Sequence, residues 1–221
     1  MRILFFFVHP SKYHLFKHSI NILKKEGHQI DVTIVTKDIL EDLIKFEGWE
    51  YENILPEGRR SKKLPPLFST IYFSLKTLFR LYMYCRSKKY DLFVSDDLLV
   101  LLGRLKSTPS IFFTDDDLRV VKEIYPLFLF ASKIVAPYCT DVGKFNYKKI
   151  GYTGYHELAY LNPKYFTPDF EKTKQFNPDG GKYFKLDLYP LPPLMITVKK
   201  ALPIKKSENL LNYWSNTEKF L

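Results

Sequence analysis

The chain has 221 residues, of which 46% are hydrophobic and 17% aromatic, enough to bury the core of one large domain or two small ones. A formal net charge of +10 favours anionic partners, but the basic residues are dispersed and mostly lysine, so a nucleic-acid interface is not expected. Cys85 and Cys139 lack the spacing of a metal or redox site, and the N-terminus lacks the features of a signal peptide.

The first fifty residues have the order strand, loop, helix, strand. An apolar run at 2–8 is followed by a polar loop, an amphipathic segment at 12–26 that ends at Gly27, and a second apolar run at 30–36. This order is typical of a doubly wound parallel sheet. Ligands of such sheets bind where the carboxyl end of a strand meets the next helix, so the loop that begins at His9 is the first candidate site.

The alternation of strands and helices continues along the chain. The further elements expected are a helix at 38–47 capped by Asp38 and ended by Gly48, a strand at 51–55, a polar loop at 56–66, helices at 67–86, 97–106 and 117–126, and strands at 91–95, 110–114, 133–136 and 150–152. We therefore predict an α/β fold, a Rossmann-like doubly wound parallel sheet, as a domain at 1–165. Seven of the 14 prolines lie between 163 and 203, which predicts a linker and an irregular tail at 166–221.

The expected helix at 67–86 is rich in apolar and aromatic residues. It contains Lys76 and Arg80, and two central cations disfavour a helix that spans a membrane. Two interpretations stay open: a crossover helix that packs on the sheet, or an interfacial helix that lies on a lipid surface. We expect a cytoplasmic protein, with peripheral contact to the inner membrane face through this helix as the second interpretation.

The loop after the first strand offers three candidate site residues. A helix N-terminus there favours anions, and histidine can act as a base near neutral pH. We predict that His9 and Lys12 contact substrate and that His14 is a candidate base; the alternative is a capping and packing loop. His14 and His18 share a helix face without an evident third ligand, so no metal is expected. The loop also lacks the glycine fingerprint of a dinucleotide site.

Acidic residues follow two later strands. Asp96 and Asp97 come after the strand at 91–95 and are predicted to bind substrate, with capping of the next helix as the alternative. The three acids Asp115, Asp116 and Asp117 follow the strand at 110–114 and repel one another unless a cation, a basic partner or ligand hydroxyls compensate. We therefore predict substrate contacts from this run as well, with Asp116 as a second candidate base.

His156 and Glu157 follow the last short strand. Gly151 and Gly154 allow tight turns around that strand, so both side chains are expected near the carboxyl edge of the sheet, where we predict that they bind substrate. The alternative is a loop that only links two domains.

Four stretches together carry a resemblance to a known family: HPSKYHLFK, SDD, FFTDDD and YTGYHELAYLNP. They resemble a family of uncharacterised prokaryotic proteins related to GT-B glycosyltransferases and UDP-N-acetylglucosamine 2-epimerases. The family pattern has lysine where this chain has His156, whereas Glu157 matches. The resemblance covers about residues 1–170 and implies the N-terminal, acceptor-side half of a GT-B fold. It implies a nucleotide sugar as substrate and no further cofactor.

The activity implied by the resemblance is that of a truncated GT-B-like glycosyltransferase. Its acceptor would be a polysaccharide or a lipid-linked sugar, and the chain would be inactive alone because the donor domain is missing. One alternative is a non-catalytic, membrane-associated partner subunit of a split glycosyltransferase. Another is a UDP-sugar 2-epimerase-like protein.

The tail does not resemble the second domain of the family. A displaced reading frame from Leu186 onward permits an RF…ASHD…GKKGI pattern that does resemble it. This predicts a frameshift near Phe184 or Lys185 and a premature stop after Leu221.

Overall fold

The structure, a computed structural model, describes residues 1–59, 65–169, 171 and 174. The chain divides into a unit at Met1–Phe166 and a second at Thr167–Leu221, and the first is described below. Nearly all of the expected irregular tail at 166–221, including the position of the frameshift predicted near Phe184 or Lys185, lies outside the described residues.

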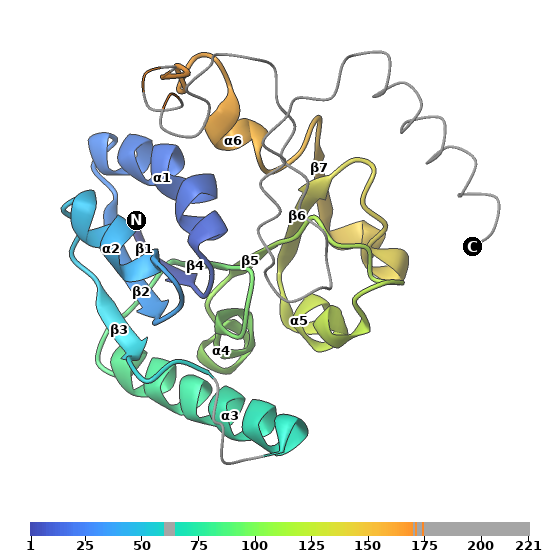
Figure 1. The fold of residues 1–221 in the computed structure, drawn as a ribbon. Helices are drawn as coiled ribbons and strands as arrows, with labels where there is room; N and C mark the ends of the chain where they lie inside the picture. Colours follow the sequence, from blue (N-terminus) through green and yellow to red (C-terminus); the bar gives the residue numbers. More distant parts are fainter. Residues whose placement is uncertain (60–64, 170, 172–173, 175–221) are drawn as a thin grey trace. The chain divides into compact units, whose positions relative to one another are not determined.

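The core of the first unit is a seven-stranded parallel sheet, which confirms the predicted fold class. Its strands are β1 (Arg2–Phe7), β2 (Gln29–Val35), β3 (Glu52–Leu55), β4 (Leu92–Ser95), β5 (Ser110–Phe113), β6 (Lys133–Pro137) and β7 (Lys149–Tyr152). They lie in the order β3-β2-β1-β4-β5-β6-β7 (Figure 1). The order reverses between β1 and β4, which makes the carboxyl ends of these two strands the expected binding crevice.

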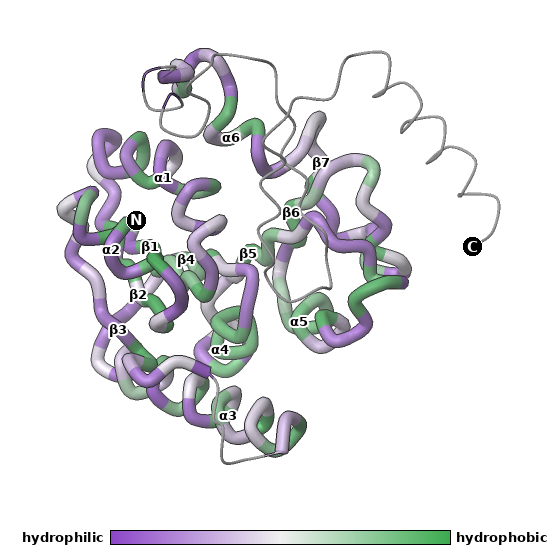
Figure 2. The backbone as a smooth tube through the Cα atoms, viewed as in Figure 1, coloured by the Kyte–Doolittle hydropathy of each residue, from purple (hydrophilic) through white to green (hydrophobic). Residues whose placement is uncertain are grey.

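Helices cover both faces of the sheet. They are α1 (Pro10–Lys25), α2 (Leu40–Phe46), α3 (Pro66–Cys85), α4 (Leu99–Lys106), α5 (Tyr125–Phe130) and α6 (Leu158–Leu161), with the 3-10 helices η1 (Lys122–Ile124) and η2 (Gly143–Lys148). Phe5 and Phe7 of β1 pack in the core that includes α1 and α2, whereas Leu4 and Phe6 pack in the core that includes α3 and α4. The strand is apolar throughout because both of its faces are buried. Figure 2 shows the hydrophobic positions gathered in β1, β2 and α4.

Two local predictions were wrong. Asp38 does not cap α2: its φ is 48°, and the helix begins at Leu40 without a side-chain cap. The helix expected at 117–126 is also displaced, because the Asp117 carboxylate accepts a hydrogen bond from the N–H of Asp141 (2.6 Å) instead of capping a helix. The segment first forms a turn, and α5 begins only at Tyr125, with Pro126 in its first turn, where proline is tolerated.

An ionic cluster closes the amino edge of the sheet. The Arg2 guanidinium donates to Asp31 Oδ2 from Nη2 (2.7 Å) and Nε (3.1 Å), and the Tyr90 hydroxyl donates to the same oxygen (2.5 Å). Lys88 Nζ lies 3.9 Å away. Burial raises the pKa of Asp31, but the hydrogen bonds from Tyr90 and Arg2 outweigh it and hold the pKa below its usual value. We call these four residues the amino-edge cluster; they connect β1, β2 and the segment before β4.

Candidate functional site

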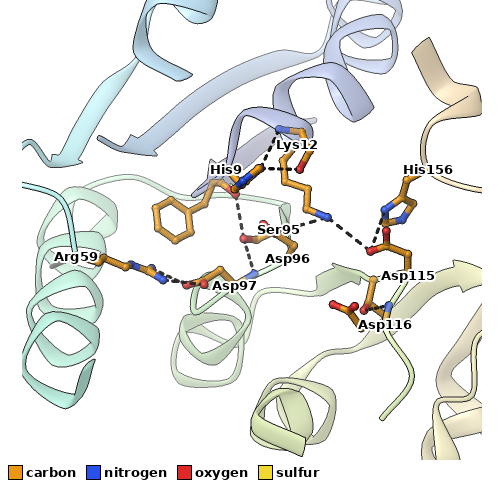
Figure 3. Close-up of polar contacts among 12 residues, drawn as sticks. His9, Lys12, Arg59, Ser95, Asp96, Asp97, Asp115, Asp116 and His156 are labelled. Carbon is orange, nitrogen blue, oxygen red and sulfur yellow. Dashed lines mark hydrogen bonds and ion pairs between the residues drawn. The ribbon is translucent and has the colours of Figure 1, made fainter. Parts of the chain in front are cut away.

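Four side chains from separate parts of the sequence meet at the carboxyl edge of the sheet (Figure 3). Lys12 Nζ of α1 lies 3.8 Å from Asp96 Oδ2 and 4.0 Å from Asp115 Oδ1. His156 Nδ1 lies 3.3 Å from Asp115 Oδ1. We call Lys12, Asp96, Asp115 and His156 the carboxyl-edge cluster. The structure thus brings together four of the residues that the sequence nominated as substrate contacts.

The two acids of the cluster occupy equivalent turns. At the end of β4, the Ser95 hydroxyl donates to the carbonyl of Phe6 (3.0 Å) and accepts from the N–H of Asp97 (3.0 Å). After β5, the Thr114 hydroxyl accepts from the N–H of Asp116 (3.1 Å) in the same i to i+2 pattern. In both turns the residue between hydroxyl and amide, Asp96 or Asp115, is the one that belongs to the cluster.

Asp96 is partly buried, and one of its carboxylate oxygens is fully enclosed. Its side chain is 18% exposed, and Oδ1 has no hydrogen-bond partner within the described part of the chain. Burial raises the pKa of this carboxyl to about 6, with the nearby Lys12 ammonium opposing the rise. Asp96 therefore titrates close to neutral pH, and a ligand hydroxyl or amide could satisfy its free oxygen.

Asp115 and His156 pair through one nitrogen of the histidine ring, Nδ1. The hydrogen bond from His156, with help from the Lys12 charge, lowers the pKa of Asp115 to about 2, so this carboxylate is ionised. His156 Nδ1 faces this carboxylate at 3.3 Å, which in the neutral ring favours the tautomer with its proton on Nδ1 and with Nε2 free to accept a proton. His156 is 6% exposed, and Nε2 has no hydrogen-bond partner among the residues described.

The local backbone and a ring contact hold His156 in place. Its ring stacks on Tyr152, at the end of β7, with ring centroids 6.1 Å apart and an interplanar angle of 12°. Gly154, between these two residues, has φ +100°, and a Cβ there would lie 2.5 Å from the Leu158 side chain. Only glycine suits this turn, which explains how a short loop brings the chain from β7 back into α6.

Two other nominated residues lie beside the cluster. The capping alternative for Asp97 is wrong, because α4 begins at Leu99 without a side-chain cap. His9 caps α1, where its Nδ1 accepts from the N–H of Ser11 (3.2 Å); burial lowers the pKa of His9, and the Lys37 charge lowers it further. Asp97 forms a two-bond ion pair with Arg59 (2.8 and 2.6 Å) and accepts from the N–H of Leu98 (2.6 Å). Both side chains thus have structural partners beside the cluster.

The remaining nominated residues lie around the cluster. The Asp116 side chain is exposed, and Glu157 is exposed at the start of α6. The His14 ring packs between Tyr13 (5.0 Å between centroids) and Tyr160 (5.3 Å), and burial lowers its pKa. The roles of His14 and Asp116 as bases stay predictions.

Sequence reasoning missed the residues that support the cluster. The hydroxyl turns carry a visible signal, since Ser95 and Thr114 each precede two adjacent acids. Arg59 has no such signal, because it belongs to a basic segment that was expected to be a loop only. The buried Tyr152 hydroxyl also lacks a hydrogen-bond partner within the described residues, so it is a further candidate ligand contact.

Comparisons with known proteins identify the fold. No protein-family model matches this sequence, and no curated protein matches it. Among solved structures, MurG from Acinetobacter baumannii is 14% identical with a TM-score of 0.50, covering 70% of this chain and 45% of its own. UDP-GlcNAc 2-epimerase from Neisseria meningitidis, bound to UDP-GlcNAc, is 15% identical with a TM-score of 0.58, covering 80% of this chain and 54% of its own.

These likenesses concern architecture. At such identities they show the fold alone: it resembles GT-B glycosyltransferases and UDP-GlcNAc 2-epimerase. The chain spans about half the length of the two solved structures.

Proposed function

We propose that residues 1–166 form the acceptor-side domain of a GT-B-like glycosyltransferase, which uses a nucleotide sugar and a polysaccharide or lipid-linked acceptor. The observation that carries the proposal is the unpartnered Nε2 of His156, held by an ionised Asp115 beside Lys12 at the carboxyl edge of the sheet. A buried, oriented histidine with one free nitrogen is the arrangement expected of a general base.

The proposed chemistry assigns one role to each member of the cluster. His156 Nε2 takes the proton of an acceptor hydroxyl while Asp115 stabilises the imidazolium that forms. The acceptor oxygen then bonds to the anomeric carbon of the donor sugar, and the bond from that carbon to the diphosphate breaks with its electron pair on the diphosphate. Asp96 Oδ1 accepts a hydrogen bond from the acceptor, and the Lys12 ammonium supports an acceptor phosphate.

The proposed reaction also needs groups that stabilise the leaving diphosphate. In a two-domain fold these come from the donor side. We therefore propose that the unit at 1–166 binds acceptor and does not transfer sugar by itself.

Ligand binding by the full chain tests this function. Saturation-transfer NMR with a soluble lipid-diphosphate-GlcNAc analogue and with oligosaccharides should detect binding to the wild type. His156→Gln should weaken binding about fivefold, because a lost hydrogen bond between neutral groups costs about 1 kcal/mol.

His18→Gln is the matched control. Like His156, this histidine stacks on a tyrosine: its ring centroid lies 4.3 Å from that of Tyr165. It lies outside the carboxyl-edge cluster. Its substitution should leave binding unchanged. Absence of binding to every sugar ligand, or equal losses in the two variants, would overturn the proposal.

A UDP-sugar 2-epimerase-like activity is the second candidate, favoured by the higher TM-score of the epimerase structure. Such an enzyme needs no acceptor. Incubation with UDP-GlcNAc alone, followed by anion-exchange chromatography, separates the candidates: formation of the C2 epimer would favour the epimerase and exclude the acceptor-side function.

A non-catalytic partner subunit of a split glycosyltransferase is the third candidate, favoured by the exposed apolar face of α3 described below. The nucleotide sequence discriminates it from a broken gene. A donor-domain pattern in the displaced frame after Lys185 supports the frameshift, whereas a complete neighbouring donor gene supports the split enzyme.

A further inference from the structure

Helix α3 has two opposite apolar faces. At 100° per residue, Phe73, Thr77, Leu81 and Cys85 lie on one face, and all four are buried against the sheet. A second set of large apolar residues lies on the opposite face, within an arc of about 120°. Each of these side chains is between 43% and 65% exposed: Phe68, Ile71, Tyr72, Leu75, Phe79, Tyr82 and Met83. We call this set the outer face of α3.

Packing within the described residues does not account for the outer face. A surface helix of a globular protein ordinarily has one apolar stripe, toward the core, and a polar face toward water. A contiguous apolar patch of this kind marks an interaction surface. The helix lies at the periphery of the unit (Figure 1), and hydrophobic positions recur along its length in Figure 2.

The charges around α3 indicate what covers the outer face. The helix contains no acidic residue. Lys76 and Arg80 lie along one edge of the outer face and both pair with Glu57, at 2.5 and 3.0 Å. The exposed Arg86 and Lys89 follow the C-terminal end of the helix. Aromatic and aliphatic side chains with flanking cations are the composition of helices that lie in the interface of anionic membranes.

We propose that the outer face of α3 docks on an anionic lipid surface, with the helix parallel to the membrane plane. The described residues contain no helix with the length and hydropathy of a membrane span. The later part of the helix lies beside the carboxyl end of β3, where Arg80 donates to the carbonyl of Ile54 (3.0 Å). The inference does not depend on the proposed transferase function.

Vesicle sedimentation with the full chain tests the proposal. The wild type should sediment with vesicles of phosphatidylcholine containing phosphatidylglycerol, and less with pure phosphatidylcholine or at high salt. The double variant Leu75→Ser with Phe79→Ser should lower the partition coefficient about tenfold or more, equivalent to 1.4 kcal/mol or more. Because both side chains are exposed, circular dichroism should show an unchanged fold.

A second double variant controls for general loss of surface hydrophobicity. Val120→Ser with Tyr147→Ser removes two side chains that are 77% and 74% exposed and lie outside α3, and it should sediment as the wild type does. Phe79→Trp adds a direct readout, since its fluorescence should shift to the blue when anionic vesicles are added.

Three results would overturn the proposal. The wild type could fail to sediment with anionic vesicles. The two double variants could lose equal binding. Alternatively, size-exclusion chromatography could show an oligomer that the α3 variant dissociates, with no vesicle binding, which would identify a second copy of the chain as the occupant. Loss of acceptor binding in His156→Gln would leave vesicle binding unchanged, so the two proposals fail separately.

Discussion

The two edges of the sheet each hold an ionic cluster, but they differ in how completely the polar atoms are paired. At the amino edge, Asp31 accepts three hydrogen bonds of 2.5–3.1 Å from Arg2 and Tyr90. At the carboxyl edge, the contacts of Lys12 are 3.8 and 4.0 Å long, and buried atoms of Asp96 and His156 have no partner among the described residues.

This difference in pairing distinguishes a cluster that stabilises the fold from one that can bind a ligand. A carboxylate oxygen that already accepts several hydrogen bonds holds elements together, and a ligand could only compete with those bonds. A buried polar atom without a partner costs stability, and a ligand that supplies the partner recovers that cost on binding. The amino-edge cluster therefore has the properties of a structural group, and the carboxyl-edge cluster those of a site.

Replacing the acid at the centre of each cluster, Asp31 or Asp115, should lower the free energy of unfolding more at the amino edge. Asp31→Ala should lower the free energy of unfolding by about 3 kcal/mol, because it leaves the Arg2 charge and the Tyr90 hydroxyl partly buried without their acceptor. Asp115→Ala should cost less than about 1 kcal/mol, since its side chain is 43% exposed. Urea unfolding followed by circular dichroism measures both. Equal losses would show that both clusters are structural.

The pH dependence of stability should have opposite signs for Asp96 and Asp31, one acid from each cluster. The pKa of Asp96 is raised from 3.8 to about 6, so its charged form is disfavoured in the folded state, and it contributes stability as pH falls from above 6 toward 4. Asp31 has a lowered pKa, so its contribution is present above its ordinary pKa of 3.8 and is lost as pH falls through the lower folded value.

The variants that test these signs are Asp96→Asn and Asp31→Asn. Asp96→Asn should raise the free energy of unfolding by about 1–2 kcal/mol at pH 7–8 and flatten its change between pH 6 and 4. Asp31→Asn should flatten the change below pH 4. Urea unfolding at intervals from pH 3 to 8 gives the profiles, and parallel profiles for the two variants would contradict the assignment.

The smallest effect is expected at His9, which lies at the carboxyl edge but acts as a helix cap. His9→Ala should cost about 0.5–1 kcal/mol of unfolding free energy, and His9→Asn should restore it, because asparagine caps helices well. If His9→Asn keeps stability but loses binding of the sugar ligands, then His9 belongs to the site as well as to the helix end.

The fold could be predicted because its signals are local. The helices before Gly27 and Gly48 end where glycine adopts positive φ, +83° and +69°, and the apolar run of β1 has no polar face because both of its faces pack. Where a distant residue intervenes, local signals fail. Asp117 has the residue type of a helix cap, yet its carboxylate bonds to the backbone of Asp141.

For the candidate site, the sequence could predict the region of the sheet edge but not which side chains pair there. Parallel strands bring the acids and histidines to one edge, so the sequence indicates the region. Which member of Asp115–Asp117 joins the cluster depends on the turn made by Thr114. The pairing of Asp115 with His156 depends on the course of β6 and β7 and on the turn at Gly154.

The central position of β1 also has a consequence for synthesis on the ribosome. Ile3 is synthesised before either of its neighbours, and it pairs with both Ile30 of β2 and Leu92 of β4. One side of the apolar strand MRILFFFV must therefore wait for nearly ninety further residues before its second neighbour emerges. Such an unpaired strand is prone to self-association. We expect nascent chains that end before β4 to need a chaperone. We also expect the complete unit to fold slowly, because residues paired in its strands are far apart in sequence.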